Sequence, residues 1–146
     1  MSMTAEQILK AAILDKVAEW IEQDDEGPSS FPKGPFDTQE KIDAAFEAIE
    51  DHGLDDDASE AESELRRSYT HETGFQGKNS RHYESKSVAR RFGDRWVGWT
   101  YCYGGGKHGE PESIEWMEDA YFVEAKEETR VVLTFTKLED VEVQGE

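Results

Sequence analysis

The chain has 146 residues, of which 36% are hydrophobic, with a formal net charge of −18 and one cysteine, Cys102. A chain of this length can bury a sizeable core without disulfides or a structural metal. A single cysteine forms no internal disulfide, and the sequence has neither an N-terminal apolar signal nor a long apolar run. We therefore expect a soluble protein in a reducing compartment such as the cytoplasm.

The negative charge is concentrated in residues 1–65, which hold 19 Asp and Glu against 4 Lys and Arg. Residues 66–146 hold 15 against 12, and within them residues 66–95 are basic, with a net charge of +5. Such an asymmetric field keeps a protein soluble and attracts partners of opposite charge.

The first predicted element is a helix that follows a capping box, Thr4 to Gln7. Apolar residues then recur at three- and four-residue spacing until a charged run that ends at Glu26. Residues 27–36 contain three prolines and two glycines and cannot continue a helix. We expect a rigid crossing loop pinned by Phe31 and Phe36, with a disordered linker between two domains as the alternative.

Two further helices are predicted before the charge pattern changes. The second begins at Asp37, with Glu40 in the reciprocal capping position, and stops at Gly53. The third starts near Asp57 and carries few apolar residues, which predicts a mostly solvated or frayed helix.

From Arg66 onward, short β-prone runs alternate with turn residues. The predicted strands are 68–73, 82–92 and 95–103, followed by a hairpin of 121–125 and 130–138. In the strand 95–103 large side chains alternate on one face, which predicts a buried Trp99. The proline-led segment 110–118 predicts a short helix.

These elements predict an α+β fold, with two or three N-terminal helices packed on one face of a four- or five-stranded antiparallel sheet. We expect a single domain over residues 1–146. Its parts are an acidic helical part, 1–65, a sheet part, 66–140, and a frayed tail, 141–146.

One glycine-rich segment is a candidate ligand loop. Its residues are Gly104, Gly105, Gly106, Lys107 and His108, with Gly109 after them. Consecutive glycine amides beside a lysine can hold an oxyanion, but the spacing of a phosphate-binding P-loop is missing, which favours a structural turn. The alternative function is therefore a small enzyme or anionic-ligand binder that uses this loop, with Cys102 as a neighbouring thiol.

Other chemistry has weaker support in the sequence. The four histidines, His52, His71, His82 and His108, show no zinc-binding spacing, so we expect no metal. No stretch of the sequence has a specific catalytic signature, so we also expect no cofactor and no catalytic residues. Tryptophans and tyrosines interleaved with arginines in residues 90–121 resemble a base-stacking platform. A net charge of −18 opposes direct binding of nucleic acid, so core aromatics with internal ion pairs are favoured.

The acidic half gives the function that we rank first, a partner-binding surface. Its candidate residues are Glu47, Glu50, Asp51, Asp55, Asp56, Asp57, Glu60, Glu62 and Glu64. Regularly spaced carboxylates on helices can imitate the phosphates of nucleic acid and block the groove of a basic, nucleic-acid-binding protein. The alternatives are a merely solubilising acidic surface and adaptation to high salt.

The stretch RHYESKSVARRFGDRWVGWTYCYGGGKHGEPESIEWMEDAYFV, residues 81–123, resembles small uncharacterised proteins carried by bacteriophages and prophages. The resemblance covers about a third of the chain and assigns no functional residue. It implies a small accessory protein in a bacterial cytoplasm, where inhibition of a host factor is a frequent role. We therefore expect a non-enzymatic acidic protein-binding module, and the sequence leaves its oligomeric state open.

Overall fold

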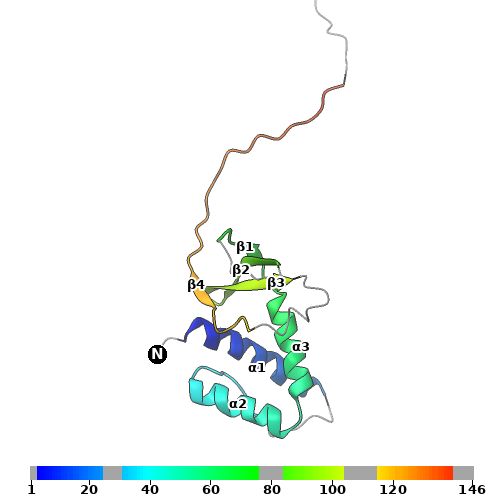
Figure 1. Ribbon diagram of the computed structural model, residues 1–146, viewed down its shortest axis with the longest axis vertical. Helices are drawn as coiled ribbons and strands as arrows, with labels where there is room; N and C mark the ends of the chain where they lie inside the picture. The colour runs from blue at the N-terminus through cyan, green and yellow to red at the C-terminus, as the bar shows by residue number, and fades with distance from the viewer. Residues whose placement is uncertain (1–2, 25–30, 76–83, 104–114, 140–146) are drawn as a thin grey trace, which may run out of the picture.

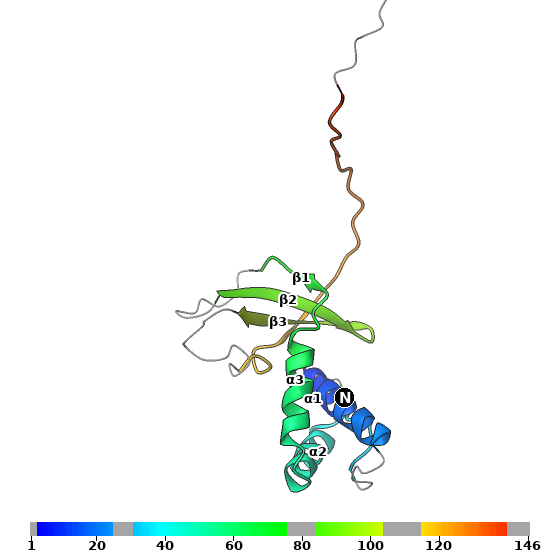
Figure 2. The ribbon, with the colours of Figure 1, turned by 90° about the vertical axis from the view of Figure 1, so that its right-hand side faces the viewer.

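The computed structural model describes residues 3–24, 31–75, 84–103 and 115–139. Its elements in chain order are α1 (Ala5–Gln23), α2 (Gln39–Asp51), α3 (Asp55–Arg66), β1 (His71–Glu72), β2 (Glu84–Phe92), β3 (Arg95–Tyr103) and β4 (Tyr121–Val123). The helices lie on one face of a four-stranded antiparallel sheet (Figures 1 and 2). The predicted α+β fold is therefore confirmed.

One hydrophobic core joins the three helices to the sheet. Its fully buried members include Leu9, Leu14 and Val17 on α1, Ile42 on α2, and Val88, Val97 and Trp99 on the strands. The loop residues Phe31 and Phe36 are also buried in this core, so they pin the loop before α2 as predicted. In the described part of the chain, no helix combines the length and apolarity needed to cross a membrane.

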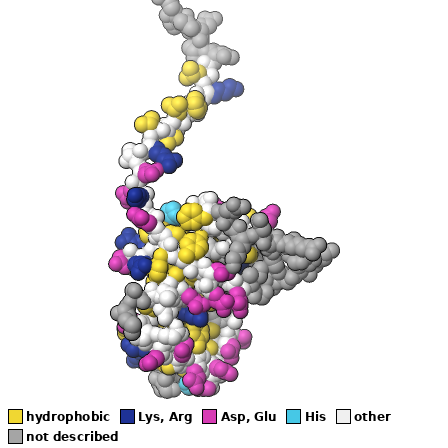
Figure 3. All heavy atoms as spheres, turned by 60° about the vertical axis from the view of Figure 1, so that its left-hand side comes forward, with side chains coloured by type: hydrophobic (Ala, Val, Ile, Leu, Met, Phe, Trp, Pro, Cys, Tyr) yellow, Lys and Arg dark blue, Asp and Glu magenta, His cyan; other side chains and the backbone are white. Residues whose placement is uncertain are grey.

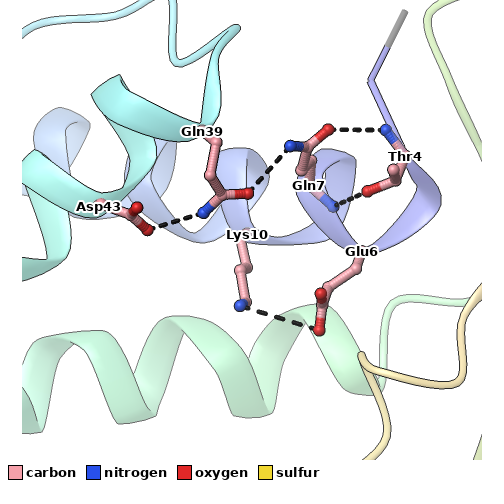
Figure 4. Close-up of polar contacts among 6 residues, drawn as sticks. All are labelled: Thr4, Glu6, Gln7, Lys10, Gln39 and Asp43. Atoms are coloured by element: carbon pink, nitrogen blue, oxygen red, sulfur yellow. Dashed lines mark hydrogen bonds and ion pairs between the residues drawn. The ribbon is translucent and has the colours of Figure 1, made fainter.

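The predicted capping box forms at the start of α1 (Figure 4). The Thr4 hydroxyl accepts a hydrogen bond from the Gln7 backbone N–H at 3.1 Å, and the Thr4 N–H donates to the Gln7 side chain at 2.8 Å. The amide of Gln7 also donates to Gln39 at 2.9 Å, and Gln39 donates to Asp43 at 2.7 Å. These bonds tie the first turn of α1 to the first turn of α2.

The predicted start of α2 is wrong by one position, because the N-cap is Thr38 rather than Asp37. The Thr38 hydroxyl accepts from the Lys41 N–H at 3.2 Å, whereas Asp37 forms an exposed ion pair with the Lys41 ammonium at 2.9 Å. Aspartate and threonine both cap helices well, so the sequence does not decide which of these two adjacent residues is the N-cap. The path of the loop before α2 decides it.

Helix α3 is less solvated than its composition predicts. It begins at Asp55, and Ala61, Leu65 and Arg66 form its buried stripe, packed mainly against α1. Two apolar residues and one arginine are enough, because α1 presents a wide apolar face to them.

The sheet has the order β1-β2-β3-β4. Strands β2 and β3 form a hairpin in which Val88 faces Trp99, and the turn uses Gly93 at φ +62°, a value that favours glycine. Strand β4 pairs with β3 through Gly98 and Tyr121. The strand predicted over 95–103 is confirmed, while those predicted over 68–73 and 121–125 shorten to β1 and β4.

One face of the sheet is covered by the described helices and the other is not (Figure 2). Val88, Val97 and Trp99 are buried on the face that meets the helices. On the other face, the ring of His71 lies 5.4 Å from that of Trp96, and the ring of Phe75 lies 6.3 Å from that of Tyr121.

The predicted strand over 130–138 is wrong. Residues 124–139 are extended and form no strand, and they run away from the body of the molecule (Figures 1 and 2). The predicted hairpin turn, 126–129, has no Gly, Asn, Asp or Pro, the residues that tight turns require. Residues 115–118 of the predicted short helix are not helical either.

Several sequence predictions fall outside the described residues. These are the glycine-rich loop, Gly104 to Gly109, residues 110–114 of the predicted short helix, residues 27–30 of the crossing loop, residues 82–83 of the second predicted strand, and the tail, 141–146.

The close approach of Tyr121 to Gly98 gives a testable prediction. A methyl group added at Gly98 would lie 2.6 Å from Cε2 of Tyr121, because the ring covers the glycine from β4. We expect Gly98→Ala to lower the free energy of unfolding by about 1–3 kcal/mol through overpacking. Chemical denaturation measures it, with Tyr121→Ala and the double variant as controls. If the alanine costs the same in the Tyr121→Ala background, the ring is not the cause.

Candidate functional site

The candidate site is the acidic surface of α2 and α3. Of its nine predicted residues, eight are exposed and one, Glu62, is half-buried. Figure 3 shows acidic side chains over the helical layer. The ion pairs that the structure shows among its described residues lie elsewhere, at Lys10–Glu6, Lys41–Asp37, Lys86–Glu72 and Arg130–Glu128.

Six of the exposed residues fall into two acidic rows. On α2, Glu50 and Asp51 follow Glu47 by three and four residues, and on α3, Asp56, Glu60 and Glu64 recur every fourth residue. Residues at these spacings share one side of a helix, about 5–6 Å apart between Cβ atoms. Each helix therefore carries a row of negative charge along one side, and Gly53, at φ +65°, lies in the turn between them.

The two rows differ in what they do for their own helices. Acids in the first turn of α3, Asp56 of its row among them, stabilise that helix because its N-terminus carries partial positive charge. Glu50 and Asp51 lie in the last turn of α2, which has no basic residue and carries partial negative charge. Helix stability therefore explains the acids at the start of α3 and does not explain those at the end of α2.

Glu62 differs from its neighbours because it lies partly inside the molecule. Burial raises its pKa, while the indole N–H of Trp116 and the charge of Arg66 act in the opposite direction. The indole nitrogen is buried and reaches no partner at normal hydrogen-bond geometry in the described structure, so its effect on Glu62 is a weak one. Glu62 therefore belongs to the interface between α3 and the sheet, and it is poorly placed to meet a partner.

The raised pKa of Glu62 predicts a pH-dependent stability. Because the folded protein holds the Glu62 proton more tightly, ionisation disfavours folding, and stability falls as pH rises above the usual value of 4.5. We expect Glu62→Gln to remove this loss and to be more stable than the parent at neutral pH. Denaturation over a pH series measures it, with the exposed Glu60→Gln as the control for one lost charge. A variant less stable at neutral pH would show that the Arg66 attraction dominates.

Three of the described basic residues of 66–95, Arg66, Arg90 and Arg91, make hydrogen bonds to uncharged groups. Arg66 is buried, donates to the Cys102 carbonyl and lies 4.3 Å from the centre of the Tyr101 ring. Arg90 donates to Ser68, and Arg91 donates to the Gly93 carbonyl. The predicted ion pairs between basic strands and acidic helices are therefore not what holds these arginines, which use carbonyls, a hydroxyl and aromatic rings instead.

The aromatic set considered as a base-stacking platform is divided between core and surface. Trp99 and Trp116 are buried against each other, with ring centres 5.5 Å apart, so neither can stack on a base. Arg95 lies 3.7 Å from the centre of the Phe122 ring. Two members of the set therefore lie in the core, which supports the prediction of core aromatics over a base-stacking platform.

A cleft of about 400 Å³ lies between α1, α3 and β2. Asp15 and Lys16 line it from α1, Glu64 lines it from α3, and Arg90 and Phe92 line it from β2. Burial raises the pKa of Asp15. Acidic and basic side chains meet in this cleft, so it offers no field of one sign to a charged ligand.

The alternative ligand loop cannot be assembled from the described residues, because Gly104, Gly105, Gly106, Lys107 and His108 lie outside them. Its described neighbour Cys102 is partly buried, and burial raises the pKa of its thiol despite the charge of Arg66. A raised pKa leaves less thiolate at neutral pH, which weakens a nucleophile. Among the described residues, no group of three His, Cys, Asp or Glu is arranged to hold a metal ion.

Three comparisons with known proteins bear on the site. No protein-family model matches the chain, and neither a curated protein nor a solved structure matches it.

Proposed function

We propose that this protein is a non-enzymatic acidic module that binds a basic, nucleic-acid-binding protein through α2 and α3. The observation that carries the proposal is the pair of acidic rows, six exposed carboxylates that follow one side of each of two packed helices. Glu50 and Asp51 oppose the dipole of α2, so their presence is better explained by a partner than by folding.

The rows suit a partner that normally holds nucleic acid. A DNA-binding groove is lined with lysine and arginine and gains most of its non-specific affinity from phosphates. Carboxylates on a folded helix present fixed negative charges at regular intervals, with no cost of ordering a chain on binding. The module therefore competes with nucleic acid for the groove, which makes it an inhibitor.

The setting that we propose is the cytoplasm of a bacterial cell. Residues 81–123 resemble proteins carried by bacteriophages and prophages, and such proteins often act on a host factor. The partner is then a nucleic-acid-binding protein of the host, and no nucleic acid, membrane, metal or cofactor takes part in binding.

Capture from a bacterial lysate at low and at high salt tests this function. Exposed charge pairs are screened over about 10 Å at 0.1 M salt, so we expect basic proteins to bind at low salt and to be released at high salt. A screen of small anions by thermal shift addresses the alternative ligand loop, because a bound ligand stabilises the fold by mass action. Salt-insensitive stabilisation by an anion, without a captured basic protein, would favour that alternative.

A further inference from the structure

Residues 130–138 form an exposed apolar segment, which we call the tail strand. Its five apolar side chains are 73–97% exposed: Val131 97%, Val132 73%, Leu133 76%, Phe135 88% and Leu138 86%. Isolated apolar residues are common on protein surfaces, but a contiguous exposed run marks a site of interaction. The tail strand is also rich in the β-branched residues valine and threonine, which favour strands.

The tail strand has the pattern of a strand with one buried face. Val131, Leu133 and Phe135 alternate with Val132, Thr134 and Thr136, and alternate residues of a strand share a face. Over residues 131–136 one face is therefore fully apolar, and the other carries one valine and two threonines. Beyond this run, Lys137 continues the first face and Leu138 the second. This pattern is typical of a strand at the end of a sheet, covered on one side only.

The tail strand is poorly suited to pair with β4 of its own chain. The six residues that join them, 124–129, contain three glutamates and none of the residues that form tight turns. In the structure this connection is extended, and six extended residues span about 20 Å. The tail strand therefore projects beyond its own sheet (Figures 1 and 2).

Strand β4 supplies a matching acceptor. It is the last strand in the sheet order, so in the described structure its outer edge has no neighbouring strand. An edge of this kind presents unpaired backbone N–H and C=O groups that a further strand can satisfy. Its side chains, Tyr121, Phe122 and Val123, are only partly buried, and Phe122 is 36% exposed.

The charges match as well. The tail strand carries Arg130 and Lys137 and no acid, whereas the chain as a whole carries −18. Glu118 precedes β4 and Glu124 follows it, so a strand added antiparallel brings Lys137 towards the first and Arg130 towards the second. A hydrogen bond with Glu115 and the like charge of Glu115 raise the pKa of Glu118, and a cation at that end offsets the repulsion between the two carboxylates.

We propose that the tail strand of one copy adds to the outer edge of β4 in a second copy, and that the exchange is reciprocal in a two-fold dimer. Both the donor strand and the acceptor edge belong to this chain, so two copies satisfy each other with no third partner. The proposal is independent of the acidic module, because it uses neither acidic row.

Light scattering after gel filtration tests the proposal with the full chain and three variants. We expect the parent to have twice the mass of one chain in the micromolar range, at low and at high salt. Leu133→Asp with Phe135→Asp should weaken the dimer at least about 100-fold, because it places charge on the buried face. Thr134→Asp with Thr136→Asp adds the same charge to the opposite face and should remain dimeric.

A disulfide identifies the pairing itself. In a Cys102→Ser background, Phe122→Cys in one isotope-labelled chain and Leu133→Cys in an unlabelled chain should form a mixed disulfide on gentle oxidation. A parent that is monomeric, or a dimer that survives the two aspartates on the apolar face, overturns the proposal. A third result also overturns it. If a single chain that carries both Phe122→Cys and Leu133→Cys forms only an intramolecular disulfide, the tail strand pairs with β4 of its own chain.

Discussion

Neutralising the two acidic rows is expected to weaken binding of the basic partner at least about 100-fold at low salt, taking about 0.5–1 kcal/mol for each exposed charge pair. The six changes are Glu47→Gln, Glu50→Gln, Asp51→Asn, Asp56→Asn, Glu60→Gln and Glu64→Gln. The remaining acids keep the protein soluble. Titration of the captured partner against the parent and the variant, at matched ionic strength, measures the loss.

A matched variant separates the rows from the total charge. It neutralises six exposed acids elsewhere, at Glu19, Glu22, Glu84, Asp94, Glu127 and Glu139. The two variants have the same net charge, so a purely long-range effect weakens both equally. Equal loss in the two variants contradicts the assignment of the site to α2 and α3.

The stability of the row variant carries a second expectation. Acids four residues apart repel each other, and Glu50 and Asp51 oppose the dipole of α2. Their neutralisation should therefore leave the melting temperature unchanged or raise it. The melting curve also shows whether a variant that binds weakly is simply unfolded.

Trp99→Ala is expected to have the largest effect on stability, a loss of about 3–5 kcal/mol in the free energy of unfolding. The side chain is 0% exposed, its indole N–H donates to the Arg66 carbonyl at 3.3 Å, and its ring packs on Trp116. A loss of this size is a large part of the stability of an ordinary domain.

Trp96→Ala is the matched control, because Trp96 lies on the same strand and points to the face without helices. It should cost clearly less than Trp99→Ala in chemical denaturation. Similar losses at the two positions would mean that the central strand does not divide the sheet into a covered and an uncovered face.

Features set by neighbouring residues were predictable from the sequence. The cap at Thr4 and Gln7 depends on residues three positions apart, and the alternation around Trp99 depends on the period of a strand. Both are confirmed. The acidic residues were also recognisable, since exposure of a charged helix surface is the ordinary outcome.

Features set by contacts distant in sequence were not predictable. The burial of Arg66 and the half-burial of Glu62 depend on β3 and Trp116, which meet α3 only in the folded chain. The strand predicted over 130–138 has the right side chains, but a strand needs a paired edge, and side-chain pattern alone does not supply one. The local signal against this strand lies outside it, in the connection 126–129, which lacks the residues of a tight turn.

Competition on the captured partner tests the central claim most directly. The partner is loaded with a fluorescent DNA or RNA duplex, and anisotropy follows the duplex as this protein is added. The account predicts complete displacement by the parent and by the matched charge variant, and little displacement by the variant that lacks the two acidic rows. A ternary complex that holds the duplex and this protein together, or displacement unchanged by loss of the rows, contradicts it.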